Sequence, residues 1–477
     1  MDETMGRIGF HSSKRLCGVR GPFALRALAA LALATLSLLA PPTVHAVTDP
    51  TPDQPLLRTL TSAVDPSELQ STITKLVAFG TRHTLSDTTS DIRGIGAARR
   101  WVQSRFEAIS RECGNCLEVV TPSQVFTGPR IPVATEVIDV VAIQRGTADP
   151  DRVIVITGHL DSMASNVMDS TTDAPGANDD ASGVAAVIEA ARVLSKHKFR
   201  ATLVFAALTG EEQGLYGGKV LAAYAKEKGW RVQANLNNDI VGNTLGQSGV
   251  RDNSSVRVFS EGTKTLETAQ QASRRRYDGG ELDTPSRNIA RYLAALADRY
   301  LTNFRVRMIY RTDRYGRGGD QVEFLAQGFP AVRLTESVED YTRQHQSVRV
   351  ENGIRYGDTI EFVDFPYLAQ VTRMNVLAMA SMANAPAPPT GVAIEGAVSP
   401  HTTLKWQTQP GVGYRAWWRA TTEPMWQYQR PVGADDAKTG RIRLDNIVID
   451  DWFFGVSSIS SDGWESPVVF PGDPGSF

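Results

Sequence analysis

The order of local patterns along the middle of the chain constrains the fold more than any other feature. From residue 137 to residue 334, short runs of apolar and β-branched residues alternate with segments of helical periodicity. Residues 153–157 (Val-Ile-Val-Ile-Thr) are an example of the first kind, and residues 181–195, with one apolar face, are an example of the second. This alternation is typical of a mainly parallel sheet with helices on both faces.

The sequence therefore predicts an α/β fold with a mixed, mainly parallel sheet. The expected strands are residues 137–144, 153–157, 202–208, 234–241, 305–310 and 331–334, and the expected helices are residues 69–79, 101–110, 181–195, 215–226, 287–301 and 365–383. Residues 242–281 are polar, and we expect them to form a long loop near the functional site, since such loops are usually functional or disordered.

The N-terminal part of the chain predicts export. Basic residues between Arg7 and Arg20 precede an uncharged run at 27–40, and Val44-His-Ala46 resembles a cleavage site. We expect residues 1–46 to be a signal peptide that is cleaved after Ala46, with an uncleaved anchor as the alternative. Because the apolar run is too short to span a bilayer comfortably, the mature protein should be secreted or periplasmic, without a stable membrane span. Residues 47–63 are rich in Pro, Asp and Thr, which indicates a flexible leader or part of a propeptide.

The C-terminal part has a different character. With 477 residues, the chain is long enough for two domains. After a Pro-rich break at 385–390, residues 385–477 contain six of the eight tryptophans and seven short alternating runs, which predicts a small all-β sandwich. Its Pro-Pro-Thr start, Trp406 and the stretch Phe454-Gly-Val-Ser resemble a fibronectin type III module, so we expect an accessory domain.

Cysteine usage and net charge argue against several classes of site and of binding partner. Only Cys113 and Cys116 remain after signal cleavage, and in an exported protein they predict a disulfide that closes a tight turn. A redox-active site is the alternative, although no thioredoxin-like pattern surrounds the pair. Two cysteines are too few for a Cys-only zinc site. The net charge of −2 gives no reason to expect a nucleic-acid partner.

Potential metal ligands follow several of the expected strands. His159 follows the strand 153–157, Glu211 and Glu212 follow the strand 202–208, and Asp239 ends the strand 234–241. Because ligands of open α/β sheets bind outside the carboxyl ends of the strands, these side chains should converge. Asp179, at the start of the helix 181–195, should join them.

This set of residues has the composition of a two-metal hydrolase. Such a site needs two cations that share a carboxylate and a water, and a separate carboxylate that takes a proton from that water. Imidazole and carboxylate ligands together suit zinc. His345, the only histidine between the strand ligands and the Pro-rich break, supplies a second imidazole. The sequence therefore predicts a zinc hydrolase.

Five short motifs occur in a characteristic order. They are His159-Leu-Asp-Ser, Asn178-Asp-Asp-Ala-Ser-Gly, Gly210-Glu-Glu, Asn238-Asp239 and His345. Together they resemble the M28 family of co-catalytic zinc peptidases, over about residues 76–383. The resemblance implies a zinc exopeptidase fold and a di-zinc peptidase domain at residues 64–384.

The resemblance also implies a role for each ligand. Asp179 matches the carboxylate that bridges two zinc ions. His159 and Asp239 match the terminal ligands of one ion, and Glu212 and His345 match those of the other. We therefore expect two Zn²⁺ as cofactors.

Further roles concern residues beside the expected ligands. Glu211 matches the general base, and Asp161 matches the carboxylate that orients the imidazole of a ligand. Tyr341 could stabilise the oxyanion, or it could simply pack in its loop. Arg317 and Asp320 are expected to contact the polar ends of the substrate.

Two details of the motifs lead to separate expectations. Relatives often have a histidine after the aspartate of the Arg317–Asp320 motif, where this chain has Gln321, and this departure puts that stretch in doubt. In the M28 family the junction at the bridging carboxylate can be a cis peptide that does not involve proline. The resemblance therefore predicts a cis bond between Asp179 and Asp180.

These observations lead us to expect an exported zinc exopeptidase, an aminopeptidase, that acts on peptide substrates. The first alternative is a carboxypeptidase or dipeptidase, for which Arg314, Arg317 or Arg343 could bind the substrate carboxylate. The second is a non-catalytic binding ectodomain on a peptidase scaffold. The sequence does not indicate the preferred side chain or the oligomeric state.

Overall fold

The computed structural model describes residues 52–474, so the expected signal peptide lies outside the described residues. All the described residues belong to one compact unit. In residues 52–474, no helix is both long enough and apolar enough to cross a membrane.

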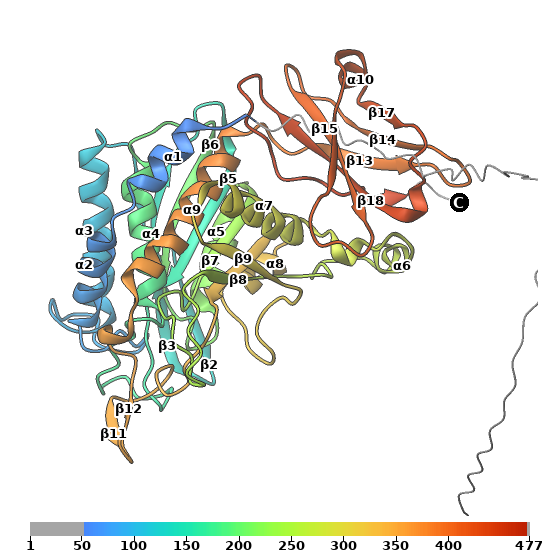
Figure 1. Ribbon diagram of the computed structural model, residues 1–477. Helices are drawn as coiled ribbons and strands as arrows, with labels where there is room; N and C mark the ends of the chain where they lie inside the picture. The colour runs from blue at the N-terminus through green and yellow to red at the C-terminus, as the bar shows by residue number, and fades with distance from the viewer. Residues whose placement is uncertain (1–51, 475–477) are drawn as a thin grey trace, which may run out of the picture. The chain divides into compact units, whose positions relative to one another are not determined.

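A central sheet of eight strands forms the larger part of the structure, in the order β1-β4-β6-β5-β7-β10-β8-β9 (Figure 1). Its strands are β1 (Glu118–Val120), β4 (Val140–Gln144), β5 (Asp149–His159), β6 (Ala201–Leu208), β7 (Arg231–Asn238), β8 (Ser255–Ser260), β9 (Arg305–Ile309) and β10 (Ala331–Glu336). The central strands β6, β5, β7 and β10 are parallel, whereas β4 and β8 run antiparallel to their neighbours β6 and β10. The predicted mainly parallel, mixed sheet is confirmed.

Helices cover both faces of this sheet (Figure 1). One face packs against α1 (Pro55–Ser62), α2 (Pro66–Val77), α3 (Gly94–Glu112), α4 (Ala181–Leu194), α7 (Pro285–Tyr300) and α9 (Phe365–Asn384), and the other against α5 (Tyr216–Glu227) and α8 (Gln321–Ala326). Along β6, for example, Leu203 and Phe205 belong to the first core, and Val204 and Ala206 to the second. Because successive strand residues point to opposite faces, a strand buried on both sides must be apolar throughout.

Three parts of the sequence interpretation need correction. In the expected flexible leader 47–63, residues 55–62 form α1, which buries Leu57 and Leu60 in the large core. The polar segment 242–281 is not only a loop, because it contains β8, whose alternating pattern includes an arginine, and α6 (Ala269–Asp278). The run 137–144 is divided between β4 and the end of β3 (Ile131–Ile138), which pairs with β2 (Ser123–Gly128) outside the central sheet.

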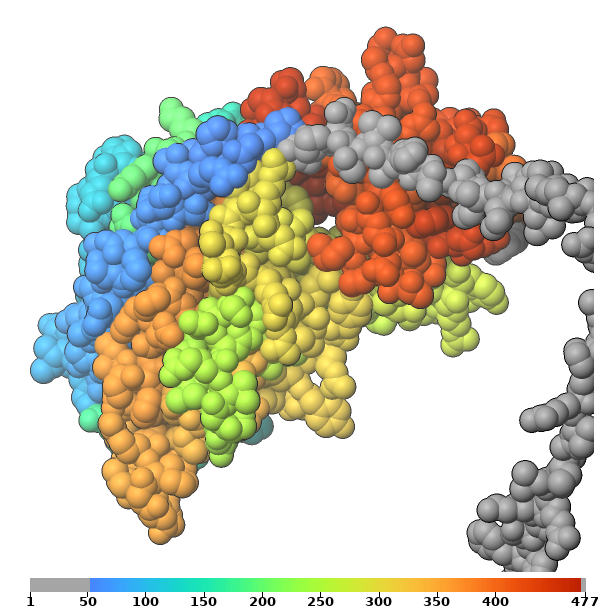
Figure 2. Space-filling model, viewed as in Figure 1, coloured from blue at the N-terminus to red at the C-terminus, as the bar shows by residue number. Residues whose placement is uncertain are grey.

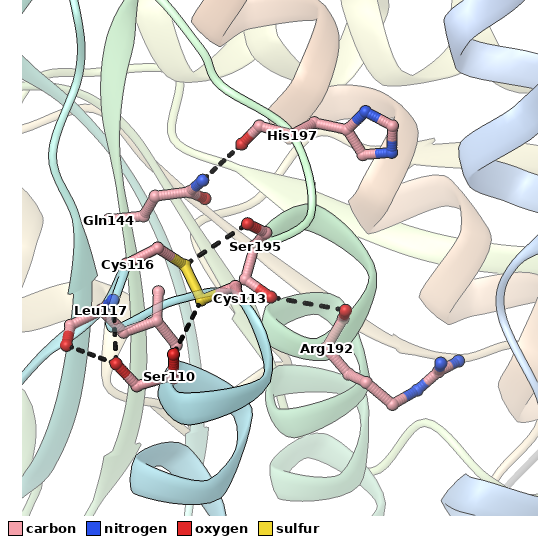
Figure 3. The surroundings of a disulfide bond; sticks show 8 residues. All are labelled: Ser110, Cys113, Cys116, Leu117, Gln144, Arg192, Ser195 and His197. Atoms are coloured by element: carbon pink, nitrogen blue, oxygen red, sulfur yellow. Dashed lines mark hydrogen bonds between the residues drawn. A yellow bond between two sulfur atoms is a disulfide. The ribbon is translucent and has the colours of Figure 1, made fainter.

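A disulfide bond closes the turn that follows α3, as predicted (Figure 3). It joins Cys113 to Cys116. Within the same turn, Ser110 Oγ donates to the carbonyl of Leu117 at 2.9 Å and accepts from its amide at 3.1 Å. Cys116 Sγ lies 3.3 Å from the carbonyl oxygen of Ser195, so the turn packs against the end of α4.

The C-terminal part consists of two small sheets that share one core. The first sheet contains β13 (Thr390–Glu395), β14 (Thr402–Gln407), β17 (Arg441–Leu444) and β19 (Asp473–Pro474), and the second contains β15 (Gly413–Ala420), β16 (Tyr428–Pro431) and β18 (Trp452–Ile459). Most neighbours pair antiparallel, but β19 pairs parallel with β13. Trp406, Trp418 and Phe454 fill the shared core. The predicted small β sheets are confirmed, but the part is not all-β, because the short helix α10 (Ala434–Thr439) lies between β16 and β17. The fibronectin type III resemblance stays a prediction.

Buried contacts attach these sheets to the rest of the same compact unit. Asp283, just before α7, pairs with Arg291 at 2.7 Å and with Arg419 of β15 at 2.6 Å. These three side chains are almost completely buried, and Trp464 packs in the large core. The C-terminal sheets are therefore joined to the α/β part by more than the linker after α9.

Candidate metal centre

The structure brings the five expected metal ligands together. His159 is the last residue of β5, Asp179 lies just before α4, and Asp239 directly follows β7. Glu212 lies in the turn after β6, and His345 lies in the loop after β10. Ligand atoms of these residues form groups in which all atoms lie within 4.8 Å of one another. The carboxyl ends of parallel strands thus converge, as expected for this type of sheet.

The two oxygens of Asp179 face different histidines. Oδ1 lies 3.1 Å from His159 Nε2, and Oδ2 lies 3.0 Å from His345 Nε2. Each histidine also faces a second carboxylate, since Asp239 Oδ1 lies 3.9 Å from His159 Nε2 and Glu212 Oε2 lies 3.3 Å from His345 Nε2. The arrangement consists of two half-sites, each with one histidine and one terminal carboxylate, that share Asp179.

The chemistry of these atoms fits metal ions. Asp179 Oδ2 and Glu212 Oε1 are buried and accept no hydrogen bond from any described residue, which is costly for a carboxylate unless a cation is near. Burial opposes protonation of His345, but Glu212 and Asp179 raise its pKa to about 11. The negative potential that produces this shift also attracts a divalent cation. Imidazole and carboxylate ligands together suit zinc.

Asp180 connects the backbone segments that carry the ligands. The predicted cis peptide between Asp179 and Asp180 is present. The side chain of Asp180 accepts hydrogen bonds from the amides of His159 at 2.9 Å, Gly183 at 2.8 Å and Ile240 at 3.3 Å. Asp180 therefore caps α4 and at the same time holds the ends of β5 and β7.

Asp161 makes a second set of connections. Its Oδ1 lies 3.6 Å from His159 Nδ1 and accepts from the amide of Glu211 at 3.2 Å. Its Oδ2 accepts from the amide of Glu212 at 3.1 Å and from the hydroxyl of Thr84 at 2.9 Å. The nearest partner of His159 Nδ1 is the backbone oxygen of Asp161, at 3.1 Å. Asp161 thus holds the imidazole mainly through its backbone oxygen and fixes the Glu211-Glu212 turn through its carboxylate, as such outer residues do in metal sites.

Glu211 lies beside the two half-sites. It forms a group with His159 and Glu212 in which the ligand atoms lie within 4.8 Å. Burial raises the pKa of Glu211 well above its ordinary value, against the effect of His159, and the carboxylates of Asp239 and Glu212 add to the shift. A carboxylate with a raised pKa next to the half-sites is suited to take and return a proton.

The other expected site residues differ in exposure. Tyr341 is 58% exposed, and the structure records no hydrogen bond between its hydroxyl and any residue in 52–474. Arg317 is partly exposed, and its Nη1 lies 3.3 Å from Gln344 Oε1, next to His345. Asp320 is buried and accepts from the amide of Gly218 at 3.0 Å, so it fixes the first turn of α5.

Gln321, the residue that put the Arg317–Asp320 motif in doubt, has a clear structural role. It is completely buried, and its Nε2 donates to Asp313 Oδ2 at 2.6 Å. Its Oε1 accepts from Asn237 Nδ2 at 3.1 Å. Gln321 thus satisfies a buried donor on β7 and a buried carboxylate, which requires a donor and an acceptor but no charge.

Sequence reasoning missed two residues that hold the ligands. Asp358 accepts from the amides of Asn178 at 2.9 Å and Asp179 at 2.6 Å. Arg333 Nη1 lies 2.7 Å from Asp239 Oδ2. A charged residue within the apolar strand β10 is a signal that could have revealed Arg333, whereas no local pattern marks Asp358.

The position of Asp358 depends on a hairpin. β11 (Arg349–Glu351) and β12 (Ile354–Tyr356) follow His345 and precede Asp358. This hairpin protrudes from the surface (Figures 1 and 2). Because its strands pair antiparallel, it returns the chain to the site, so that Asp358 comes back to the peptide that carries Asp179.

Comparison with known proteins agrees with a metal centre built from histidine and carboxylate ligands. Residues 139–360 match the model of Peptidase family M28. A probable zinc metalloprotease of Leptosphaeria maculans is 42% identical over 427 residues, which cover 88% of this chain and 98% of the relative. A probable zinc metalloprotease of Pyrenophora tritici-repentis is 40% identical over 429 residues, which cover 88% of each chain.

The fold and the site are those of a zinc metallopeptidase. The chain belongs to peptidase family M28.

Solved structures show the same fold at lower identity. LapB from Legionella pneumophila superimposes with a TM-score of 0.51 and 19% identity, over 71% of this chain and 78% of that one. The LapA aminopeptidase of the same organism superimposes with a TM-score of 0.50 and 19% identity, over 70% of this chain and 76% of that one. The α/β part is therefore a zinc exopeptidase-type fold.

Proposed function

We propose that this zinc metallopeptidase is an exported aminopeptidase with two zinc ions. The observation that carries the proposal is the position of Asp179 between two histidine half-sites, with Glu211 beside them. The likeness in fold to an aminopeptidase supports the exopeptidase activity. Export is supported by the N-terminal sequence pattern and by the disulfide, which is typical of oxidising compartments.

The ligand assignment follows the two half-sites. His159 and Asp239 would hold one zinc, Glu212 and His345 the other, and Asp179 would bridge them. Zinc bound there would lower the pKa of a bound water and polarise the peptide carbonyl. Without cations the converging carboxylates would repel one another, which is a further reason to assign cations to this site.

Glu211 is the proposed general base. Its carboxylate is close to His159 and Glu212 but is not needed to complete either half-site. Its raised pKa favours transfer of the proton first to Glu211 and then to the amine of the leaving group. Asp161 holds the turn through the amides of Glu211 and Glu212, so the base keeps its position while the proton moves.

Specificity for N-termini would come from the same carboxylates. A free α-amine is cationic and is attracted to this negative site, whereas a blocked amine is not. Tyr341 is exposed in the loop before His345 and could reach a developing oxyanion. Arg317 is the partly exposed group of its motif and could contact the substrate, while Asp320, being buried, would position α5 instead.

A specific observation keeps a carboxypeptidase or dipeptidase as the second candidate. Arg257, Arg314 and Arg317 all pair with the single carboxylate of Glu339 in the loop that leads to His345. Arg314 Nη1 is buried and donates no hydrogen bond to a described residue. Arg314 also pairs with Asp313 at 3.3 Å, so the three arginines still outnumber the two carboxylates. The remaining positive charge could bind a substrate α-carboxylate. A non-catalytic role is disfavoured because no expected ligand is missing.

Two experiments test these proposals. Peptides blocked at the N-terminus should resist hydrolysis while peptides amidated at the C-terminus are cleaved, and the reverse pattern would establish the carboxypeptidase. Glu211→Gln should keep both zinc ions and lower kcat by roughly 10²–10⁴-fold. Glu212→Gln, the matched control, should lose affinity for one zinc. Loss of zinc in the Glu211 variant, with full activity once metal is restored, would show that the two roles are misassigned.

A further inference from the structure

One expected zinc ligand already has a cationic partner within the protein. Arg333, on β10, is completely buried, and its Nη1 lies 2.7 Å from Asp239 Oδ2. Its Nη2 lies 3.5 Å from the backbone oxygen of Asp239. The other carboxylate oxygen, Oδ1, faces His159 at 3.9 Å. Asp239 therefore has one oxygen free for a metal ion, and the second is held by the guanidinium group.

The terminal carboxylate of the other half-site has no such partner. Glu212 Oε2 faces His345 at 3.3 Å, and Oε1 is buried without a hydrogen bond from any described residue. Within residues 52–474, the Glu212 side chain forms no ion pair with an arginine or a lysine. Arg130 Nη1 donates to the backbone oxygen of Glu212 at 2.8 Å and forms no ion pair with its carboxylate. The two half-sites thus have similar ligand types, but only the carboxylate of Asp239 is in direct contact with a guanidinium group.

This difference affects metal binding in a predictable direction. A fixed positive charge stabilises the buried Asp239 carboxylate when no metal is bound, and it repels a divalent cation when one is bound. A group that favours the metal-free state more than the metal-bound state must lower the affinity for the metal. The same contact leaves only one oxygen of Asp239 available as a ligand.

We propose that Arg333 is a positioning residue that keeps the metal-free centre folded and weakens zinc binding at the His159–Asp239 half-site. The inference rests on the proposed two-zinc site. It gives the protein a more weakly held zinc at this half-site than the same ligands would have without the arginine.

A neighbouring carboxylate provides a test in the opposite direction. Arg333 Nη1 also lies 3.4 Å from Asp313 Oδ2, and Gln321 holds that oxygen at 2.6 Å. Asp313 therefore neutralises part of the charge of Arg333. Removal of the Asp313 charge should strengthen the effect of Arg333 on Asp239 and weaken zinc binding, whereas removal of Arg333 should strengthen zinc binding.

The experiment measures zinc affinity by chelator competition in the full-length protein, together with thermal unfolding of the metal-free and zinc-loaded forms. In Arg333→Met, one of the two zinc dissociation constants should tighten by about tenfold or more while the other stays unchanged, and the metal-free form should unfold at a lower temperature. In Asp313→Asn, the same constant should weaken. Arg287→Met, the control, removes another buried arginine that contacts no expected ligand, and it should lower stability without changing either zinc constant.

Several results would overturn the inference. Unchanged or weaker zinc binding in Arg333→Met would mean that the arginine has only a structural role. If Arg333→Met does not fold without metal, the test rests on Asp313→Asn. An unchanged or tighter zinc dissociation constant in Asp313→Asn would refute the inference. Wild-type protein that binds no zinc, or one ion only, would refute the two-zinc site itself and this inference with it.

Discussion

Replacement of Asp161 by asparagine should disturb the metal centre without removing a ligand. The carboxylate accepts from Glu211, Glu212 and Thr84 and faces the Nδ1 atom of His159. An asparagine has the same shape, but its amide group must present hydrogen atoms to some of these donors. Because the Thr84 hydroxyl can also accept a hydrogen bond, the amide should turn toward Thr84 and Glu212, so that the Glu212 amide loses its acceptor.

The size of the effect follows from these contacts. The substitution removes the negative charge opposite His159 and one charge-assisted hydrogen bond, worth about 1.5–3 kcal/mol when buried. A loss of this size corresponds to about 10–100-fold, in line with the effect of outer residues on metal sites. We expect zinc affinity, kcat/KM or both to fall by that factor in Asp161→Asn.

The assay combines chelator competition for zinc with hydrolysis of an N-terminal amino-acid amide at saturating zinc. Thr84→Val is the matched control, since it removes one donor to Asp161 and leaves the charge in place. Thr84→Val should change the zinc affinity and kcat/KM only a few-fold. If Asp161→Asn stays within about twofold of the wild type in both measurements, the charge of the Asp161 carboxylate does not support the metal centre, which would refute this prediction.

Three further predictions concern the supports of the site and the C-terminal sheets. Asp358→Asn should weaken zinc binding, measured by chelator competition, because the peptide of Asp179 loses a charged acceptor; unchanged affinity would contradict this. Asp283→Leu should lower the free energy of unfolding, measured by denaturant titration, by about 3–5 kcal/mol, since Arg291 and Arg419 are both left buried without a counter-ion. Adding Arg419→Met should restore part of that loss. A chain that ends at Asn384 should still hydrolyse small amides but unfold at a lower temperature, and a folded yet inactive product would show that the sheets help to build the site.

Four of the five expected ligands were found from the sequence because they lie at or near the end of a regular element, whereas His345 lies in a loop after β10. His159 ends β5, and Asp239 follows β7, so apolar runs of the right length were enough to place them at one edge of the sheet. The cis peptide before Asp180 came from the family resemblance and not from any local pattern. Where periodicity and strand order decide the geometry, sequence reasoning succeeded.

The missed features all depend on contacts between distant segments. Asp358 meets Asp179 only because the β11–β12 hairpin returns the chain to the site. Helix α1 was interpreted as a leader because Pro, Asp and Thr dominate its surroundings, while two leucines decide its burial. Arg333 lies in a strand that was correctly predicted, but its partner Asp239 could be identified only once β7 and β10 were known to be neighbours.

The central claim is that Asp179 joins two zinc ions. Anomalous diffraction at the zinc absorption edge, from crystals of the zinc-loaded protein, measures this directly. We expect two peaks about 3.5–4 Å apart, one beside His159 and Asp239 and the other beside Glu212 and His345, both in contact with the Asp179 carboxylate. A single peak, or two peaks of which only one contacts Asp179, would contradict it.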